Sequence, residues 1–111
     1  MICKLSDVAD IAANTWYEFS LQTDKALLSI MLYLDNGELI AFKNSCPHQG
    51  RRMDYMAGKF LLAQNGNIVC PAHGAEFNAH TGLCINGPCL GQSLQPIKVS
   101  SDEKSIFAVI E

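Results

Sequence analysis

The hydrophobic and polar positions of this chain form short runs separated by turn residues. Residues 16–21 (WYEFSL) and 26–35 (ALLSIMLYLD) are rich in aromatic and branched side chains, and ELIAFK follows from residue 38. Asn36-Gly37 separates the second run from the third. An Asn-Gly pair between two apolar runs is the strongest short-range signal for a β-hairpin. We therefore predict an antiparallel hairpin with its turn at these two residues.

The rest of the pattern predicts the same kind of element. A second Asn-Gly pair, Asn65-Gly66, separates FLLAQ from NIVC, and LQPIKV and SIFAVIE flank the polar turn SSDEKS near the end of the chain. No window sustains a 3.6-residue apolar period beyond one helical turn at residues 7–13. About eight or nine strands are expected in total. The predicted fold class is therefore all-β with antiparallel sheets.

Length and composition favour one domain. The chain has 111 residues, of which 49% are hydrophobic, so residues 1–111 are expected to bury a real core without help from a metal. The longest apolar run, residues 26–34, is far shorter than the ~20 residues that a membrane helix needs. The N-terminal stretch MICKLSDVAD lacks the basic-then-apolar pattern of a secretory signal. We expect a cytoplasmic protein with no membrane partner.

Charge also limits the function. The formal net charge is -3, and the charged residues are scattered singly along the chain. Proteins that bind nucleic acid concentrate their lysines and arginines in a stripe or patch. A nucleic-acid partner is therefore not expected.

Five cysteines in a short chain raise the question of disulfides or metals. An odd number in a reducing compartment favours metal binding or free thiols. Cys46 and His48 lie in the stretch CPHQG, and Cys70 and His73 lie in CPAHG. Each stretch follows a predicted strand, so both are expected on loops carried by a rigid scaffold. Each also has a proline that fixes the backbone and a glycine that lets it approach a bound group.

These four side chains offer two thiolates and two imidazoles as ligands. Zinc accepts such a set in a tetrahedral site, but zinc sites usually pair cysteine with cysteine and histidine with histidine along the chain. Mixed pairs suit two metals, with both cysteines on one iron and both histidines on the other. An iron–sulfur centre is favoured, and a zinc site is the alternative.

The two stretches resemble the two cluster-binding boxes of Rieske-type ferredoxins and related domains. Downstream, Phe77 and Thr81-Gly82 are similar to the strand and turn that follow the second box in that family, so the resemblance spans about residues 28–111. It implies a Rieske-type fold of antiparallel sheets, with a cluster-binding part formed by two loops over roughly residues 43–90. It also implies one [2Fe-2S] cluster per chain, with these ligands: Cys46, His48, Cys70 and His73.

The sequence departs from the family pattern at several positions. Residues 49–69, which separate the two boxes, are longer than the usual interval by a few, which places an insertion within residues 51–67 that shapes a docking surface. High-potential respiratory members have a serine and a tyrosine where this chain has Ala75 and Phe77. They also join the loops by a disulfide at the positions of Arg51 and Ala72. The resemblance therefore implies a low-potential, ferredoxin-like centre.

Four other residues have competing interpretations. In GLCINGPCLG, Cys84 and Cys89 are further ligands, a redox pair, a disulfide or buried thiols, and we favour buried thiols because free cysteine often packs as a small hydrophobe. Cys3 is expected to be an ordinary strand residue. His80, in the polar stretch NAHTG, is expected in a solvated turn and not as a ligand.

The expected function is electron transfer. No G-x-G-x-x-G stretch opens a helix, and the chain leaves no room for the catalytic domain of an oxygenase, so no enzyme activity is expected of it alone. The resemblance implies a soluble one-electron carrier between a reductase and a terminal oxygenase or similar enzyme. The alternatives are the small subunit of an assimilatory nitrite reductase and a zinc-stabilised interaction module. Arg51 and Arg52 are either a solvated pair or a site for a redox partner's carboxylates.

Overall fold

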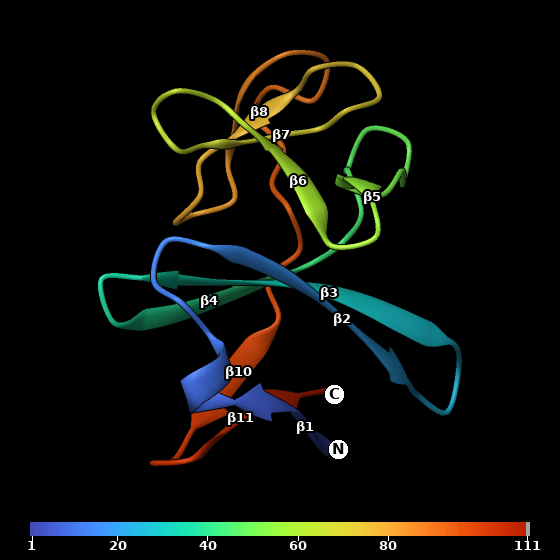
Figure 1. Cartoon of the computed structure of the whole chain (residues 1–111). Coiled ribbons are helices and arrows are strands. Elements are labelled where there is room, and N and C mark those ends of the chain that lie inside the picture. Colours follow the sequence, from blue (N-terminus) through green and yellow to red (C-terminus); the bar gives the residue numbers. More distant parts are fainter. Residues whose placement is uncertain (111) are drawn as a thin grey trace.

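Three antiparallel sheets make up the computed structural model, which describes residues 1–110 (Figure 1). The lower sheet has the order β1-β11-β10, the middle sheet β2-β3-β4 and the upper sheet β5-β6-β7-β8-β9. In chain order the strands are β1 (Ile2–Asp7), β2 (Trp16–Gln22), β3 (Leu27–Asp35), β4 (Glu38–Lys43), β5 (Asp54–Met56), β6 (Lys59–Leu62), β7 (Ile68–Val69), β8 (Glu76–Phe77), β9 (Cys84–Asn86), β10 (Lys98–Ser101) and β11 (Ser105–Val109). The prediction of an all-β, antiparallel fold is confirmed.

The middle sheet is buried on both faces. Met31 of β3 points into one hydrophobic core, while its neighbours Ile30 and Leu32 point into another, and none of the three is exposed to solvent. Successive side chains on a strand point to opposite faces, so a strand covered on both sides needs an unbroken apolar run. This explains why residues 26–34 show no alternation of apolar and polar positions.

The predicted hairpin joins β3 to β4. Asn36 and Gly37 have φ of 50° and 84°, the pair of positive values that a type I′ turn requires. The register runs from Asp35 opposite Glu38 to Ile30 opposite Lys43. The Asn-Gly signal therefore locates the turn correctly.

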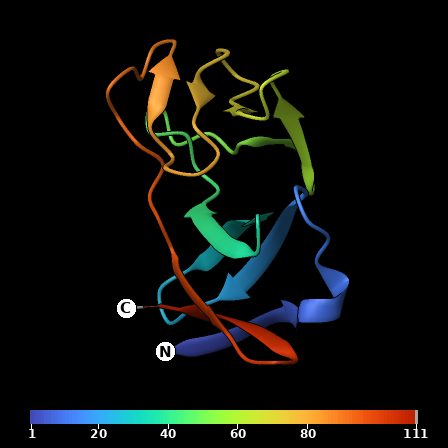
Figure 2. The same cartoon turned by 90° about the vertical axis from the view of Figure 1, so that its left-hand side faces the viewer.

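The lower sheet covers one face of the middle sheet and brings the chain ends together. Ile106 and Ala108 of β11 pack against the side chains of Ile30 and Leu32 in one core. The Met1 ammonium donates to the Ile110 carbonyl at 2.9 Å, and the Ile110 N–H donates to the Met1 carbonyl at 2.8 Å. Both ends of the chain thus lie side by side at the base of the molecule, opposite the upper sheet (Figures 1 and 2).

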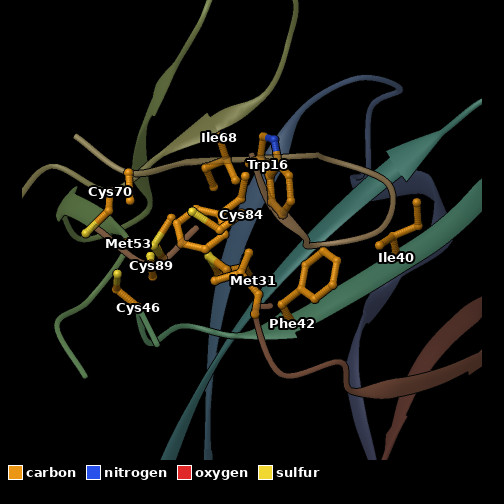
Figure 3. Close-up of a cluster of buried hydrophobic side chains, with 13 residues drawn as sticks. Trp16, Met31, Ile40, Phe42, Cys46, Met53, Ile68, Cys70, Cys84 and Cys89 are labelled. Carbon is orange, nitrogen blue, oxygen red and sulfur yellow. The ribbon is translucent and has the colours of Figure 1, made fainter. Parts of the chain in front are cut away.

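The upper sheet is built from short strands and carries both predicted ligand loops. After the upper sheet, the chain runs back to the base beside β4 through residues 95–97. There the Lys43 N–H donates to the Gln95 carbonyl at 2.8 Å, and the Ile97 N–H donates to the Ala41 carbonyl at 2.9 Å. A second core fills the space between the upper and middle sheets and is rich in sulfur (Figure 3). The loops therefore rest on a packed base.

Some details differ from the sequence expectations. The structure has more strands than the eight or nine predicted, because β7 and β8 contain two residues each and β5 and β9 three each. Segments this short carry no readable period. The helical turn expected at residues 7–13 is a 3-10 helix, η1 (Val8–Asp10). Residues 51–67, in which the insertion is predicted, contain the β5-β6 hairpin. Among residues 1–110, no helix has the length and apolar character to cross a membrane.

Gly82, between β8 and β9 of the upper sheet, lies against Phe42 of the middle sheet, and its replacement tests this contact. A Cβ atom at Gly82, which has φ of +78°, would lie 2.6 Å from Cε1 of Phe42. We expect Gly82→Ala to lower the free energy of unfolding by about 2–4 kcal/mol, through backbone strain and displacement of the ring. Gly66→Ala is the matched control, since φ is +89° and the space is open; it should cost only about 1 kcal/mol. Equal losses in urea denaturation would show that the ring is not tightly packed against Gly82.

Candidate metal centre

The two predicted ligand loops share one backbone design. In each loop the cysteine carbonyl accepts a hydrogen bond from the N–H four residues on, and the cysteine N–H donates to the carbonyl five residues on. The distances are 2.7 Å for Cys46 with Gly50, 2.7 Å for Cys46 with Arg51, 2.9 Å for Cys70 with Gly74 and 2.8 Å for Cys70 with Ala75. Gly50 and Gly74 close the loops with φ of 69° and 74°, values that glycine adopts without strain. The repeated CP…G pattern thus encodes two equivalent turns.

The loops place thiols inside and imidazoles outside. Cys46 and Cys70 are 3% and 1% exposed, whereas His48 and His73 are exposed at the surface. The two imidazole rings lie edge to face, with centroids 5.5 Å apart and planes at 82°. The structure therefore brings the predicted ligands together as two pairs, the cysteines inside and the histidines outside. Among residues 1–110, no three His, Cys, Asp or Glu side chains form a single group that could hold one metal ion.

The inner pair has the chemistry of a metal site. Burial raises the pKa of the Cys70 thiol; the backbone N–H groups of Ala72 and His73 oppose this rise, and the neighbouring Cys46 thiol adds to it. Two adjacent buried thiolates would repel one another unless cations lie between them. Two ferric ions and two sulfides bring a charge of +2, which two thiolates neutralise, so the donor set fits a [2Fe-2S] cluster.

A buried polar network fixes the first loop to the middle sheet. The side chain of Asn44 donates to Ser29 Oγ at 3.1 Å and to Asp54 Oδ1 at 3.0 Å, and its carbonyl oxygen accepts from the Met53 N–H at 2.6 Å. Asn44, at the start of the Cys46 loop, is therefore bonded to Ser29 of β3, to Met53 just before β5 and to Asp54 of β5. Sequence reasoning did not identify this network, because nothing in the spacing of residues 44 and 54 indicates that they touch.

Asp54 is held by a charged partner as well as by Asn44. Arg52 donates to both Asp54 carboxylate oxygens, at 2.8 and 2.9 Å. Burial acts to raise the pKa of Asp54, but the hydrogen bonds from Arg52, from Asn44 and from the Gly58 N–H together lower it below its ordinary value. Arg52 also lies 3.5 Å from a carboxylate oxygen of Glu18. The two arginines of the first loop therefore differ: Arg52 is engaged within the molecule, while exposed Arg51 has no carboxylate within 4 Å in residues 1–110.

Cys84 and Cys89 are free and buried, as predicted. Cys84 donates its S–H to the Asn86 carbonyl at 3.2 Å. Burial raises the pKa of Cys89 to about 12, with further contributions from the thiols of Cys84 and Cys46 beside it. Figure 3 shows these sulfur atoms gathered at the end of the core that faces the ligand loops.

Cys3 and His80 lie away from the candidate ligands. Cys3 is a residue of β1, as predicted. The His80 side chain is half exposed in its turn, as predicted, and additionally pairs with Asp35 at 2.9 Å and Glu38 at 3.5 Å. The hydrogen bond to Asp35, together with the charge of Glu38, raises the pKa of His80. This pair connects the turn after β8 to the β3-β4 hairpin.

The lowered pKa of Asp54 predicts how stability varies with pH. A carboxyl group with a lowered folded-state pKa stabilises the fold above its unfolded pKa, and this contribution is lost as the pH falls through the folded value. We expect Asp54→Asn to lower the free energy of unfolding by about 1–3 kcal/mol at pH 7. The difference from the wild type should shrink as the pH falls from about 5 to 3.

Thermal unfolding followed by circular dichroism measures this effect. Asp24→Asn makes the same charge change at an exposed turn and serves as the control, with little expected effect. A deficit in Asp54→Asn that stays constant down to pH 3 would contradict the role given to the ionised carboxylate.

Comparison with known proteins agrees with this geometry. The family model of the Rieske [2Fe-2S] domain matches residues 1–104. Human apoptosis-inducing factor 3 is 35% identical over 78 residues, which make up 70% of this chain and 12% of the human protein. The matched part is therefore a small share of that curated relative.

Two solved structures are similar in fold. The ferredoxin of carbazole 1,9a-dioxygenase from Nocardioides aromaticivorans IC177 has a TM-score of 0.74 at 18% identity and covers 100% of this chain and 99% of its own. A chain in a complex of reduced oxygenase and oxidized ferredoxin in carbazole 1,9a-dioxygenase has a TM-score of 0.72 at 21% identity, covering 96% and 91%. The family match over residues 1–104, together with this fold, shows that the chain belongs to the Rieske [2Fe-2S] domain family.

Proposed function

We propose that this chain is a Rieske-type ferredoxin that passes single electrons from a reductase to a terminal oxygenase or a similar enzyme. The domain family carries one [2Fe-2S] cluster and is an electron carrier, not a catalytic enzyme. The observation that supports the proposal most is the arrangement of the ligand loops, with buried thiols and exposed imidazoles. Such an arrangement holds a redox centre firmly while keeping one side of it at the protein surface.

Each of the four side chains has a role in this proposal. Cys46 and Cys70 bind one iron from within the core, and His48 and His73 bind the other iron at the surface. The bound cluster supplies the one-electron redox chemistry. The backbone N–H groups of Ala72 and His73, which act on the Cys70 sulfur, offset part of the negative charge that the sulfur gains on reduction. We further propose that residues 1–111 are one domain, with a cluster-binding part at about residues 43–90.

The surface beside the histidines suits a redox partner protein. A shallow pocket there is lined by residues of both ligand loops and of β5, including Arg51, Tyr55 and Pro71. Tyr55 is 55% exposed, and the guanidinium group of Arg51 has no carboxylate within 4 Å among residues 1–110. We propose that a carboxylate of the partner binds Arg51 while apolar groups pack on Tyr55 and Pro71. Of the two interpretations of the arginines, we therefore favour a docking role, for Arg51 alone.

A role within a larger protein or complex is the second candidate. The match to human apoptosis-inducing factor 3 occupies only 12% of that protein, so a related domain works inside a longer chain. The small subunit of an assimilatory nitrite reductase would use the same surface permanently. Affinity purification from the native cell separates the two: a ferredoxin is recovered with transient, salt-sensitive partners, and a subunit with one large partner at equal molar ratio. The cytoplasmic location remains part of the proposal.

Iron and sulfide analysis tests the ligand set. We expect about two irons and two acid-labile sulfides per chain, and loss of both in Cys46→Ser and in Cys70→Ser, because each removes a thiolate from the inner pair. Cys3→Ser is the matched control: it makes the same change in β1, away from the loops, and should keep full iron content. A colourless wild-type protein with one zinc per chain would end the proposal in favour of the interaction module.

The charge of Arg51 is expected to control the approach of anions to the histidine face. Ferricyanide, a trianionic oxidant, should oxidise reduced Arg51→Glu about three- to tenfold more slowly than the wild type at low ionic strength, and the difference should shrink at ~0.15 M salt. Lys25→Glu makes the same charge change at the exposed β2-β3 turn and should leave the rate nearly unchanged. The oxidation rates are measured by stopped flow. Equal slowing in both variants would show that the net charge of the protein, and not the position of Arg51, controls the rate.

A further inference from the structure

A second hollow adjoins the proposed docking pocket. Tyr55 lines that pocket and also lines a hollow of about 230 Å3 that has no other residue in common with it. The second hollow is formed where β6 of the upper sheet meets β2 of the middle sheet, and there the rings of Trp16 and Phe60 pack with centroids 6.0 Å apart. Exposed Tyr55 is therefore a ridge between two neighbouring hollows.

The second hollow offers a positive charge and hydrogen-bond donors. Lys59 lines it, is exposed, and has no carboxylate within 4 Å among residues 1–110. The indole N–H of Trp16 is buried and has no hydrogen-bond partner in the described part of the chain, which is rare for a buried donor. The side-chain oxygen of Asn14, in the same lining, already accepts from the Tyr33 hydroxyl at 3.4 Å. The hollow therefore suits an acceptor that carries a negative charge.

Charge is distributed unevenly between the two ends of the molecule. Residues 44–97, which include the upper sheet and both ligand loops, contain three basic and two acidic residues, a net charge of +1. The rest of the chain contains five basic and nine acidic residues, a net charge of -4. A [2Fe-2S] cluster held by two thiolates adds no charge when oxidised and one negative charge when reduced, so the difference persists in both states. Such an asymmetry turns the upper sheet, and not the base, toward an acidic partner.

The two unpaired cations flank exposed apolar side chains. Arg51 lies in the first pocket and Lys59 in the second hollow, with Tyr55 between them. Leu62, which also lines the second hollow, is 48% exposed. An apolar centre with a polar rim is typical of protein–protein interfaces. Nucleic acids and anionic membranes select denser clusters of cations, and the net charge of -3 opposes both.

We infer that the second hollow extends the docking surface and selects an acidic partner protein. One carboxylate of the partner binds Lys59 in this hollow, another binds Arg51, and an apolar group of the partner packs on Tyr55 and Leu62. Two charged contacts on either side of Tyr55 fix the orientation of the partner as well as its position. This inference rests on the proposed function, because it takes the surface beside the ligand loops as the docking site of a redox partner.

Electron transfer to two haem proteins of opposite charge tests the inference by stopped flow. Reduced Lys59→Glu should transfer electrons to cytochrome b5, an acidic protein, about three- to tenfold more slowly than the wild type at low ionic strength. Lys59→Arg keeps the charge and should stay near the wild type. Lys104→Glu makes the same charge change at the exposed β10-β11 turn and should alter the rate far less. With cytochrome c, a basic protein, Lys59→Glu should not be slower than the wild type.

Binding without electron transfer provides a second measurement. Trp16 is the only tryptophan of the chain and lines the second hollow, so 5-fluorotryptophan at this position gives a single 19F NMR signal that reports on the hollow. Titration of the oxidised protein with oxidised cytochrome b5 should shift this signal. The Kd from the titration should rise about three- to tenfold in Lys59→Glu and remain near the wild-type value in Lys59→Arg.

The outcomes are distinguishable. A rate that falls by the same factor in Lys59→Glu and Lys104→Glu, or a 19F signal that does not respond to cytochrome b5, overturns the inference. An equal response to a DNA duplex or to phosphatidylserine vesicles overturns the assignment to a protein partner. A wild-type protein without iron and sulfide refutes the proposed function, whereas a protein that holds its cluster and transfers electrons equally fast with and without Lys59 refutes only the role of the second hollow.

Discussion

Two thiol groups must be kept side by side out of water while the two imidazoles next to them in sequence stay in it, and the rest of the structure follows from that constraint. A loop that reverses direction within five residues achieves this, because the cysteine at its start points inward and the histidine near its apex points outward. Both loops use the same pair of hydrogen bonds and the same left-handed glycine. The difference of one residue between CPH and CPAH thus changes the position of the histidine but not the closure of the loop.

Loops of this kind need a rigid support, and the middle sheet provides it. Its central strand is buried on both faces, with Met31 under the ligand loops and Ile30 and Leu32 over the lower sheet. Asn44 and Asp54 connect this base to the first loop through buried polar bonds whose loss would leave unpaired groups in the core. Rigidity benefits electron transfer, because a centre that moves little on reduction has little reorganisation to undergo.

The local features of this fold could be predicted from the sequence, and its long-range contacts could not. Asn36-Gly37 and the two CP…G stretches are short patterns that each favour a particular backbone turn, so the hairpin and the loops could be located from the sequence. The strands β7 and β8 contain two residues each, which is too short for a periodic pattern in the sequence. They form by pairing with the neighbouring strands. The contact between Asn44 and Asp54, and that between His80 and Asp35 across 45 positions, depend on how the sheets stack. Likewise, Cys89 was recognised as buried, but its place beside Cys46 required the fold.

The pairing of Met1 with Ile110 at the base of the molecule makes this fold a modular unit. Both attachment points lie at the end opposite the upper sheet, which carries the ligand loops (Figure 1), so polypeptide added at either one, or at both, need not cross the proposed docking surface. A tether there could also hold a redox partner near the face at a high effective concentration. A domain of this shape is therefore compatible with two arrangements, a diffusing electron carrier and a domain fused to its redox partner. Neither arrangement requires a change in the ligand loops.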